Sequence, residues 1–148
     1  MSISIKYDTK EVQLKIKDME QGLSDLTVPF QQTGDDLIKF YGKEVFESEG
    51  GAMDGRWRPL SAGTILARAM RRGHYANPPI ATDKILTWTG DLRNGFKKQV
   101  SRLQLVISNS VEYFKYNQPD RPMLGINQKV IDIVMKNITS YINKIVKK

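Results

Sequence analysis

Apolar residues recur at helical spacing near both ends of this 148-residue chain and lose that spacing in the middle. Near the N-terminus they follow Asp8, which lies three residues before Glu11 as in a capping box. This first stripe predicts an amphipathic helix over residues 9–26. Near the C-terminus, Asn127 can cap a long final helix that carries a second stripe. The first stripe is Val12, Ile16, Met19, Leu23 and Leu26, and the second is Ile131, Val134, Ile138, Tyr141, Ile142 and Ile145.

A further helix is predicted directly after the first. Pro29 suits its first turn, and Gly50-Gly51 ends it. We expect the two N-terminal helices to pack as an antiparallel pair, because only a short link joins them. The expected buried face of the second helix is Phe30, Leu37, Ile38, Tyr41 and Val45.

Residues 50–84, in which Gly, Pro and Arg accumulate, are predicted to form an irregular and mobile loop region. Only the stretch from Ser61 to Arg72 has helical spacing, with Ser61 as its N-cap. Asn77-Pro78-Pro79 can sustain neither a helix nor a central strand. The apolar side of the short helix is Ile65, Leu66, Ala69 and Met70.

Two strands, 96–100 and 103–108, are predicted to form a hairpin around Ser101-Arg102, with Leu103, Leu105 and Ile107 alternating. Residues 111–116 fit a helix or a strand equally well, and alternation within residues 1–8 fits a short strand or an arm. The chain is therefore predicted to be one α+β domain over residues 1–148. It has an antiparallel N-terminal helix pair, a small antiparallel β-sheet and a long C-terminal helix.

Charge is divided unevenly along the chain. The whole sequence has 23 Lys and Arg against 16 Asp and Glu, a net +7. Residues 1–54 hold six lysines and eleven acids, a net −5, so residues 55–148 carry +12. An acidic half followed by a basic half fits nucleic-acid contact, or electrostatic complementarity between copies of one protein.

Catalytic residues are scarce. There is no Cys, and the single histidine, His74, lies in an Arg-rich loop without the spacing of a zinc site. The Gly-rich stretch 50–55 lacks the Lys-Ser/Thr ending of a phosphate-binding loop. We predict no enzyme activity, no cofactor and no metal. A metal-dependent nuclease built on Asp35, Asp36 and His74 is a minor alternative. No apolar run has the length of a membrane span and the first residues lack a signal-peptide pattern, so we expect no membrane contact.

The segment 55–82 contains five arginines and no acid. It could follow a phosphate backbone, bind an acidic protein surface or be a solvated loop. Trp57, just before the Pro-stiffened turn at Pro59, is interpreted first as a lid on the core and second as an interface anchor. The candidate oligomer or partner interface is Arg56, Trp57, Arg58, Pro59, Leu60, Arg68, Arg71 and Arg72.

Four segments resemble a known family. Residues 55–64 (GRWRPLSAGT) are similar to the "W-x-P-L-S-x-x-T" segment of the tailed-phage virion morphogenesis proteins, also called tail completion proteins. In the family's order follow residues 85–93 (ILTWTGDLR), two strands, residues 113–118 (YFKYNQ) and residues 121–126 (RPMLGI). The resemblance covers residues 30–148. Positions matching the family's structural motifs are Ser61, Thr64, Thr89, Gly90, Leu92, Arg121 and Pro122.

Two departures from the family pattern lie close together. Asn117 stands where the family often has His, and residues 118–121 are shorter than the family's usual loop. The resemblance implies a non-enzymatic assembly protein of the virion tail or neck, made in the host cytoplasm. It also implies a ring, commonly sixfold, that contacts other tail and neck proteins.

The charge division is compatible with such a ring. We hypothesise that residues 1–54 of one copy face the basic region of the next, with Arg56, Trp57 and Arg58 near the contact. The alternative is a small basic DNA-binding protein that contacts the genome at the portal exit without sequence specificity.

Overall fold

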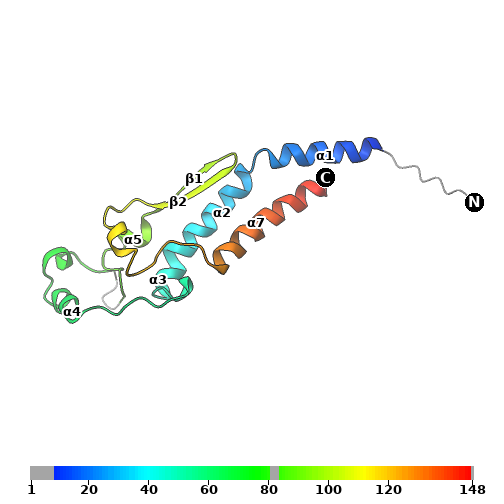
Figure 1. Ribbon diagram of the computed structural model, residues 1–148. Coiled ribbons are helices and arrows are strands. Elements are labelled where there is room, and N and C mark those ends of the chain that lie inside the picture. The colour runs from blue at the N-terminus through cyan, green and yellow to red at the C-terminus, as the bar shows by residue number, and fades with distance from the viewer. Residues whose placement is uncertain (1–8, 81–83, 148) are drawn as a thin grey trace, which may run out of the picture.

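The computed structural model describes residues 9–80 and 84–147 and is elongated, with α1 and the C-terminus at one end and α4 at the other (Figure 1). The expected strand or arm at residues 1–8 and the Asp8 cap lie outside the described residues. The helical elements are α1 (Thr9–Leu23), α2 (Thr27–Lys39), η1 (Phe40–Glu44), α3 (Val45–Glu47), η2 (Gly51–Met53), α4 (Ala62–Ala69), η3 (Gly73–Ala76), α5 (Asp91–Asn94), α6 (Phe114–Asn117) and α7 (Gln128–Val146). The strands are β1 (Phe96–Ser101) and β2 (Gln104–Asn109).

A continuous helical rod runs from Thr27 to Glu47 through α2, η1 and α3. The middle piece, η1, is π-helical, so residues five apart come onto the same face there. This brings Phe40 and Phe46 into the core together with the expected Tyr41 and Val45, and all four are at most 3% exposed. A regular 3.6-residue spacing did not predict the burial of Phe40 and Phe46.

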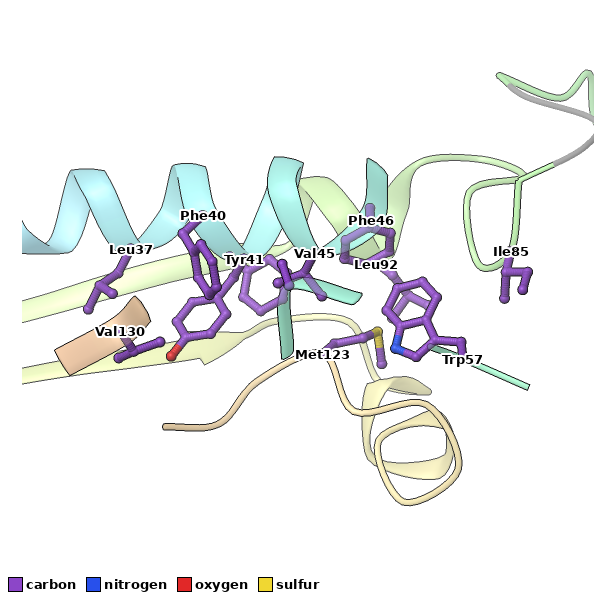
Figure 2. Close-up of a cluster of buried hydrophobic side chains, with 12 residues drawn as sticks. Leu37, Phe40, Tyr41, Val45, Phe46, Trp57, Ile85, Leu92, Met123 and Val130 are labelled. Carbon is purple, nitrogen blue, oxygen red and sulfur yellow. The ribbon is translucent and has the colours of Figure 1, made fainter. Parts of the chain in front are cut away.

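The core lies along one side of this rod (Figure 2). The ring of Tyr41 stacks on Phe96 of β1 with centroids 5.7 Å apart, and Phe46 meets Phe96 edge-on at 6.4 Å. Met123, from the segment before α7, is fully buried among them. The cluster also includes Leu37, Ala52, Trp57, Ile85, Leu92 and Val130. Segments far apart in sequence therefore share one core.

The hairpin is antiparallel, as predicted, and its register pairs Phe96 with Asn109 and Ser101 with Gln104. The turn is therefore Arg102-Leu103, one residue later than expected, and Leu103 is 67% exposed instead of half-buried. Backbone contacts fix the turn, because the Leu26 N–H donates to the Arg102 carbonyl at 2.7 Å. This places the tip of the sheet against the α1–α2 link.

The long C-terminal helix begins as predicted, with the Asn127 side chain accepting the Val130 N–H at 3.1 Å. It packs against both N-terminal helices and runs antiparallel to them (Figure 1). The two predicted N-terminal helices are present, but they do not pack on each other as the expected antiparallel pair: they follow one another in roughly the same direction, and each packs against α7 (Figure 1). Val130, Ile133 and Val134 of α7 meet the core, whereas Ile131, which the sequence stripe had included, is 44% exposed.

These elements confirm the predicted α+β class, with two N-terminal helices, an antiparallel hairpin and a long C-terminal helix. The stretch 111–116, which fitted a helix or a strand, leads into the short helix α6. Among the described residues, no helix combines the length and apolar character needed to cross a membrane.

Candidate interaction surface

Trp57 is the centre of the first motif segment. Its side chain is 4% exposed and meets Phe46 edge-on at 5.2 Å, and its backbone N–H donates to the Glu49 carbonyl at 2.7 Å. Gly50, at φ +88°, lies directly beneath the indole, where a Cβ would collide with the ring. Trp57 is therefore a core lid, the first of the two roles predicted for it, and its buried indole is not available as an interface anchor.

The first and last motif segments are joined by reciprocal hydrogen bonds. The Trp57 Nε1–H donates to the Pro122 carbonyl at 2.9 Å. In the opposite direction, the Arg121 guanidinium donates to the Arg58 carbonyl at 3.3 Å and to the Pro59 carbonyl at 3.4 Å. Arg121 and Pro122, predicted from the family motif to be structural, thus hold the turn that carries Trp57.

Ser61 starts α4 as predicted. Its Oγ accepts the Thr64 N–H at 3.1 Å and lies 2.9 Å from the Thr64 Oγ1. The apolar side expected to be buried is instead in solvent, since Ile65, Leu66 and Met70 are 56%, 57% and 48% exposed.

The buried residue of α4 is Arg68, at 8% exposure. Its guanidinium lies over the rings of Tyr75 and Trp88, at 5.4 and 5.2 Å from their centroids, and its Nη1 donates to the Lys84 carbonyl at 3.0 Å. Desolvated cation–π contacts of this kind stabilise a buried guanidinium. Arg68, predicted as an interface residue, instead attaches α4 to the segment 84–88. Sequence spacing could not reveal this, because the three side chains come from three separate segments.

The second motif segment forms a tight turn. The Thr89 Oγ1 donates to Asp91 Oδ2 at 2.6 Å, and Gly90 has φ +82°, a left-handed conformation that favours glycine. Leu92 follows in α5 and is 3% exposed in the core. The segment is also tied to the rod, because the Ile85 N–H donates to the Glu49 side chain at 3.2 Å.

The third segment contacts the second and the fourth. Gln118 Oε1 accepts the N–H groups of Met123 and Leu124 at 2.9 and 3.2 Å. Tyr113 lies near the Thr89 turn: burial raises the pKa of its phenol, and hydrogen bonding with Thr89 opposes that shift.

The four motif segments (55–64, 85–93, 113–118 and 121–126) are therefore joined to one another. We refer to this arrangement as the motif junction. The hydrogen bonds Trp57–Pro122 and Gln118–Met123 link three of the segments, and hydrogen bonding between Tyr113 and Thr89 links the fourth. Trp57, Leu92 and Met123 of the junction are buried, and the side chains of Gln118 and Arg121 are hydrogen-bonded to backbone groups.

Four arginines extend from this region and are exposed: Arg56, Arg58, Arg71 and Arg72. We call them the arginine surface. None of them forms an ion pair in the described part of the chain. Arg56 and Arg58 precede α4 in the chain, and Arg71 and Arg72 follow it. Of the two remaining interface candidates, Pro59 is exposed and Leu60 packs against the core.

Some acidic residues of the N-terminal half pair with basic residues of the same copy. Asp35 pairs with Lys98 of β1 at 2.6 Å, and Asp25 lies 3.9 Å from Arg102 in the hairpin turn. Hydrogen bonds from Thr27 hold the pKa of Asp25 below its usual value, and Arg102 adds to this. Glu44 and Glu47 on the rod remain exposed and have no ion-pair partner among the described residues.

The residues of the nuclease alternative are not assembled into a site. Asp36 accepts hydrogen bonds from Gln32 and Asn137, and Asp35 pairs with Lys98. His74 is exposed and lies against the Tyr75 ring at 3.8 Å. Residues 9–80 and 84–147 contain no group of three or more His, Cys, Asp or Glu that could hold a metal ion.

Comparisons with protein-family models, with curated proteins and with solved structures found no match to this chain.

Proposed function

We propose that this chain is a non-enzymatic assembly protein of a tailed phage that acts in tail completion or at the head–tail neck. In this proposal it forms a ring, commonly sixfold in such proteins, as a tail terminator or connector. Its partners are other copies of itself and neighbouring tail and neck proteins. It assembles in the host cytoplasm and remains in the virion.

The motif junction is the observation that carries this proposal. The segments that resemble tail completion proteins are spread over residues 55–126, yet they contact one another through side chains at the matching positions. A chance similarity of short strings gives no reason for them to meet in space. Their contacts support treating them as one structural unit, as expected if the resemblance reflects a shared fold.

The exposed charges supply a means of self-assembly. A head-to-tail ring needs two different complementary surfaces on each subunit. The arginine surface is one, and the rod with exposed Glu44 and Glu47 is the other. Charged rims of this kind mainly accelerate and orient association, and salt weakens them.

Charge reversal tests the proposal. We expect the molar mass of the wild-type protein in solution to rise with concentration at low salt and to fall as salt is added. The variant R56E/R58E/R71E/R72E should remain monomeric where the wild type assembles, with an unchanged circular dichroism spectrum because the four side chains are exposed. Light scattering across a salt series measures this.

A matched control reverses four exposed lysines elsewhere: Lys97, Lys129, Lys136 and Lys144. It changes the net charge by the same amount and should still assemble. If the arginine variant assembles as the wild type does, the arginine surface is not the contact. If the wild type is monomeric at high concentration and low salt, the protein does not form a ring by itself.

DNA binding is the second candidate, favoured by the four arginines that lack carboxylate partners. Contacts between all four and phosphates would give a slope of about −3.6 in log affinity against log salt concentration. An electrophoretic mobility shift with duplex DNA at low salt tests it, and absence of a shift would remove this candidate.

A further inference from the structure

An apolar groove crosses the middle of the molecule between α2, β2, the segment 124–126 and α7. It is a cavity of about 440 Å³ whose walls include Phe30 and Leu37 of α2, Leu105 and Ile107 of β2, and Ile126. Ile126 stands at the rim and is 82% exposed. An apolar surface of this kind is typical of a site that receives another molecule or segment.

A polar atom inside the groove also lacks a partner. Thr33 lines the groove from α2 and is 0% exposed, and its Oγ1 has no hydrogen bond among the described residues. Because the Thr33 side chain has no exposed surface, its hydroxyl is not open to an inserted segment, and the groove presents a mainly apolar lining.

The same chain exposes an apolar feature at its far end. Ile65, Leu66 and Met70 share one side of α4 and are 56%, 57% and 48% exposed. Among the described elements, α4 makes its main contacts with η3, so this side has no cover in its own copy. The groove elements lie in the middle of the molecule, apart from α4 (Figure 1).

The size and charge of the two features match. An engineered cavity of about 150 Å³ holds one benzene molecule, so 440 Å³ has room for roughly three apolar side chains. Residues 27–47, the helical rod beside the groove, hold two lysines and four acids, a net −2, and of these acids Asp35 is paired with Lys98 within the same copy. Residues 55–82, which surround α4, hold five arginines and no acid.

We propose that α4 of one copy inserts its apolar side, Ile65, Leu66 and Met70, into the apolar groove of a second copy. The arginine surface then lies against the acidic rod beside that groove. The contact is head-to-tail, because the inserted helix and the groove are different surfaces of one chain. This inference rests on the proposed ring and specifies the contact that builds it.

The α1–α7 end carries the competing apolar surface. Leu14 and Ile16 of α1 are 63% and 51% exposed, and Met135 of α7 is 56% exposed. However, residues 9–23 hold three lysines and three acids, so α1 has no net charge to complement the acidic rod. We therefore assign the groove to α4, and α1 becomes the alternative outcome of the test.

Crosslinking between single-cysteine variants tests the assignment directly, since the wild-type chain contains no Cys. The full-length variants L66C and I126C are mixed and treated with a short bismaleimide, and the adducts are identified from their peptide masses. We expect a 66–126 adduct that can form only between copies. The matched control replaces L66C with L14C, which is also an exposed leucine on a helix, and should give no comparable adduct.

An adduct of L14C with I126C that exceeds the 66–126 adduct would overturn the inference in favour of α1. If light scattering shows that the protein assembles but no 66–126 adduct forms, α4 is not the inserted helix and the proposed ring stands on another contact. If the protein neither assembles nor crosslinks, the inference and the autonomous ring both fail.

Salt also distinguishes an apolar contact from a charged one, because salt screens charge contacts and leaves apolar contacts in place. The variant L66S/M70S should lower the association constant by at least about tenfold, and this loss should persist at high salt, where charge contacts are screened. The matched variant L103S changes a leucine that is 67% exposed in the hairpin turn and should assemble normally. Normal assembly of L66S/M70S would overturn the inference.

Discussion

Trp57 connects several segments through one side chain. Its ring packs on Phe46 and Gly50, and its N–H satisfies the Pro122 carbonyl. Because these partners come from the rod, its terminal turn and the segment before α7, no neighbouring residue could replace the contacts.

We expect W57A to lower the free energy of unfolding by about 3–5 kcal/mol, the range for removing a buried aromatic side chain. W57F keeps an aromatic ring and loses the N–H, so its cost should be clearly smaller. Urea unfolding followed by circular dichroism measures both. Equal costs for W57A and W57F would show that the ring contributes little beyond the hydrogen bond.

The burial of Arg68 could not be predicted from the spacing of residues in the sequence. Helical spacing correctly predicted that Arg68 lies on α4. It was also predicted to be an interface residue, together with the other arginines of the segment 55–82. The rings of Tyr75 and Trp88 decide its burial, and both lie beyond the end of α4 at Ala69. Its four companions in the segment remain exposed, so composition could not separate them.

At the scale of elements, caps were predictable because they depend on residues within one turn. Ser61 and Asn127 both accept the expected backbone N–H. The π-helical turn at η1 was not predictable, because it results from packing Phe40 and Phe46 into the same core as Tyr41 and Val45.

Replacing the two capping residues by Ala should lower the free energy of unfolding by different amounts. Ser61 is exposed and its side chain contacts Thr64, so S61A should cost about 1 kcal/mol. The half-buried Asn127 also donates from Nδ2 to the Ala52 carbonyl at 2.8 Å, so N127A should cost about 2 kcal/mol.

N127D separates the two roles of Asn127, because aspartate can cap α7 but cannot donate to Ala52. Its cost should therefore reflect the lost bond and the carboxylate facing a carbonyl. Urea denaturation of the three variants measures these costs. A cost of N127A no greater than that of S61A would contradict the second role.

At the scale of the whole molecule, the core and the α1 end are separable. No described residue of α1 belongs to the core cluster, and α1 meets the body mainly through α7. The Tyr141 hydroxyl donates to the Gly22 carbonyl at 3.2 Å, and Gly22 packs closely against Ile145. These contacts fix the position of α1 but do not build the core.

A chain that begins at residue 25 should therefore fold. We expect cooperative thermal unfolding, a helical signal reduced by about one helix, and a lower melting temperature because α7 loses a partner. Circular dichroism with a temperature scan checks this. Loss of cooperativity in the truncated chain would show that α1 is part of the folding unit.

The sequence alone determined the local features: the amphipathic helices at both ends, the Ser61 and Asn127 caps, the antiparallel hairpin and the uneven charge. Each depends on residues within a few positions of one another, where spacing and backbone chemistry are sufficient. Only the tertiary structure decided which faces are buried. Trp57 and Arg68 became packing residues, while Ile65, Leu66 and Met70 stayed in solvent. Burial depends on what lies opposite a side chain in space, and here the opposing groups come from distant segments.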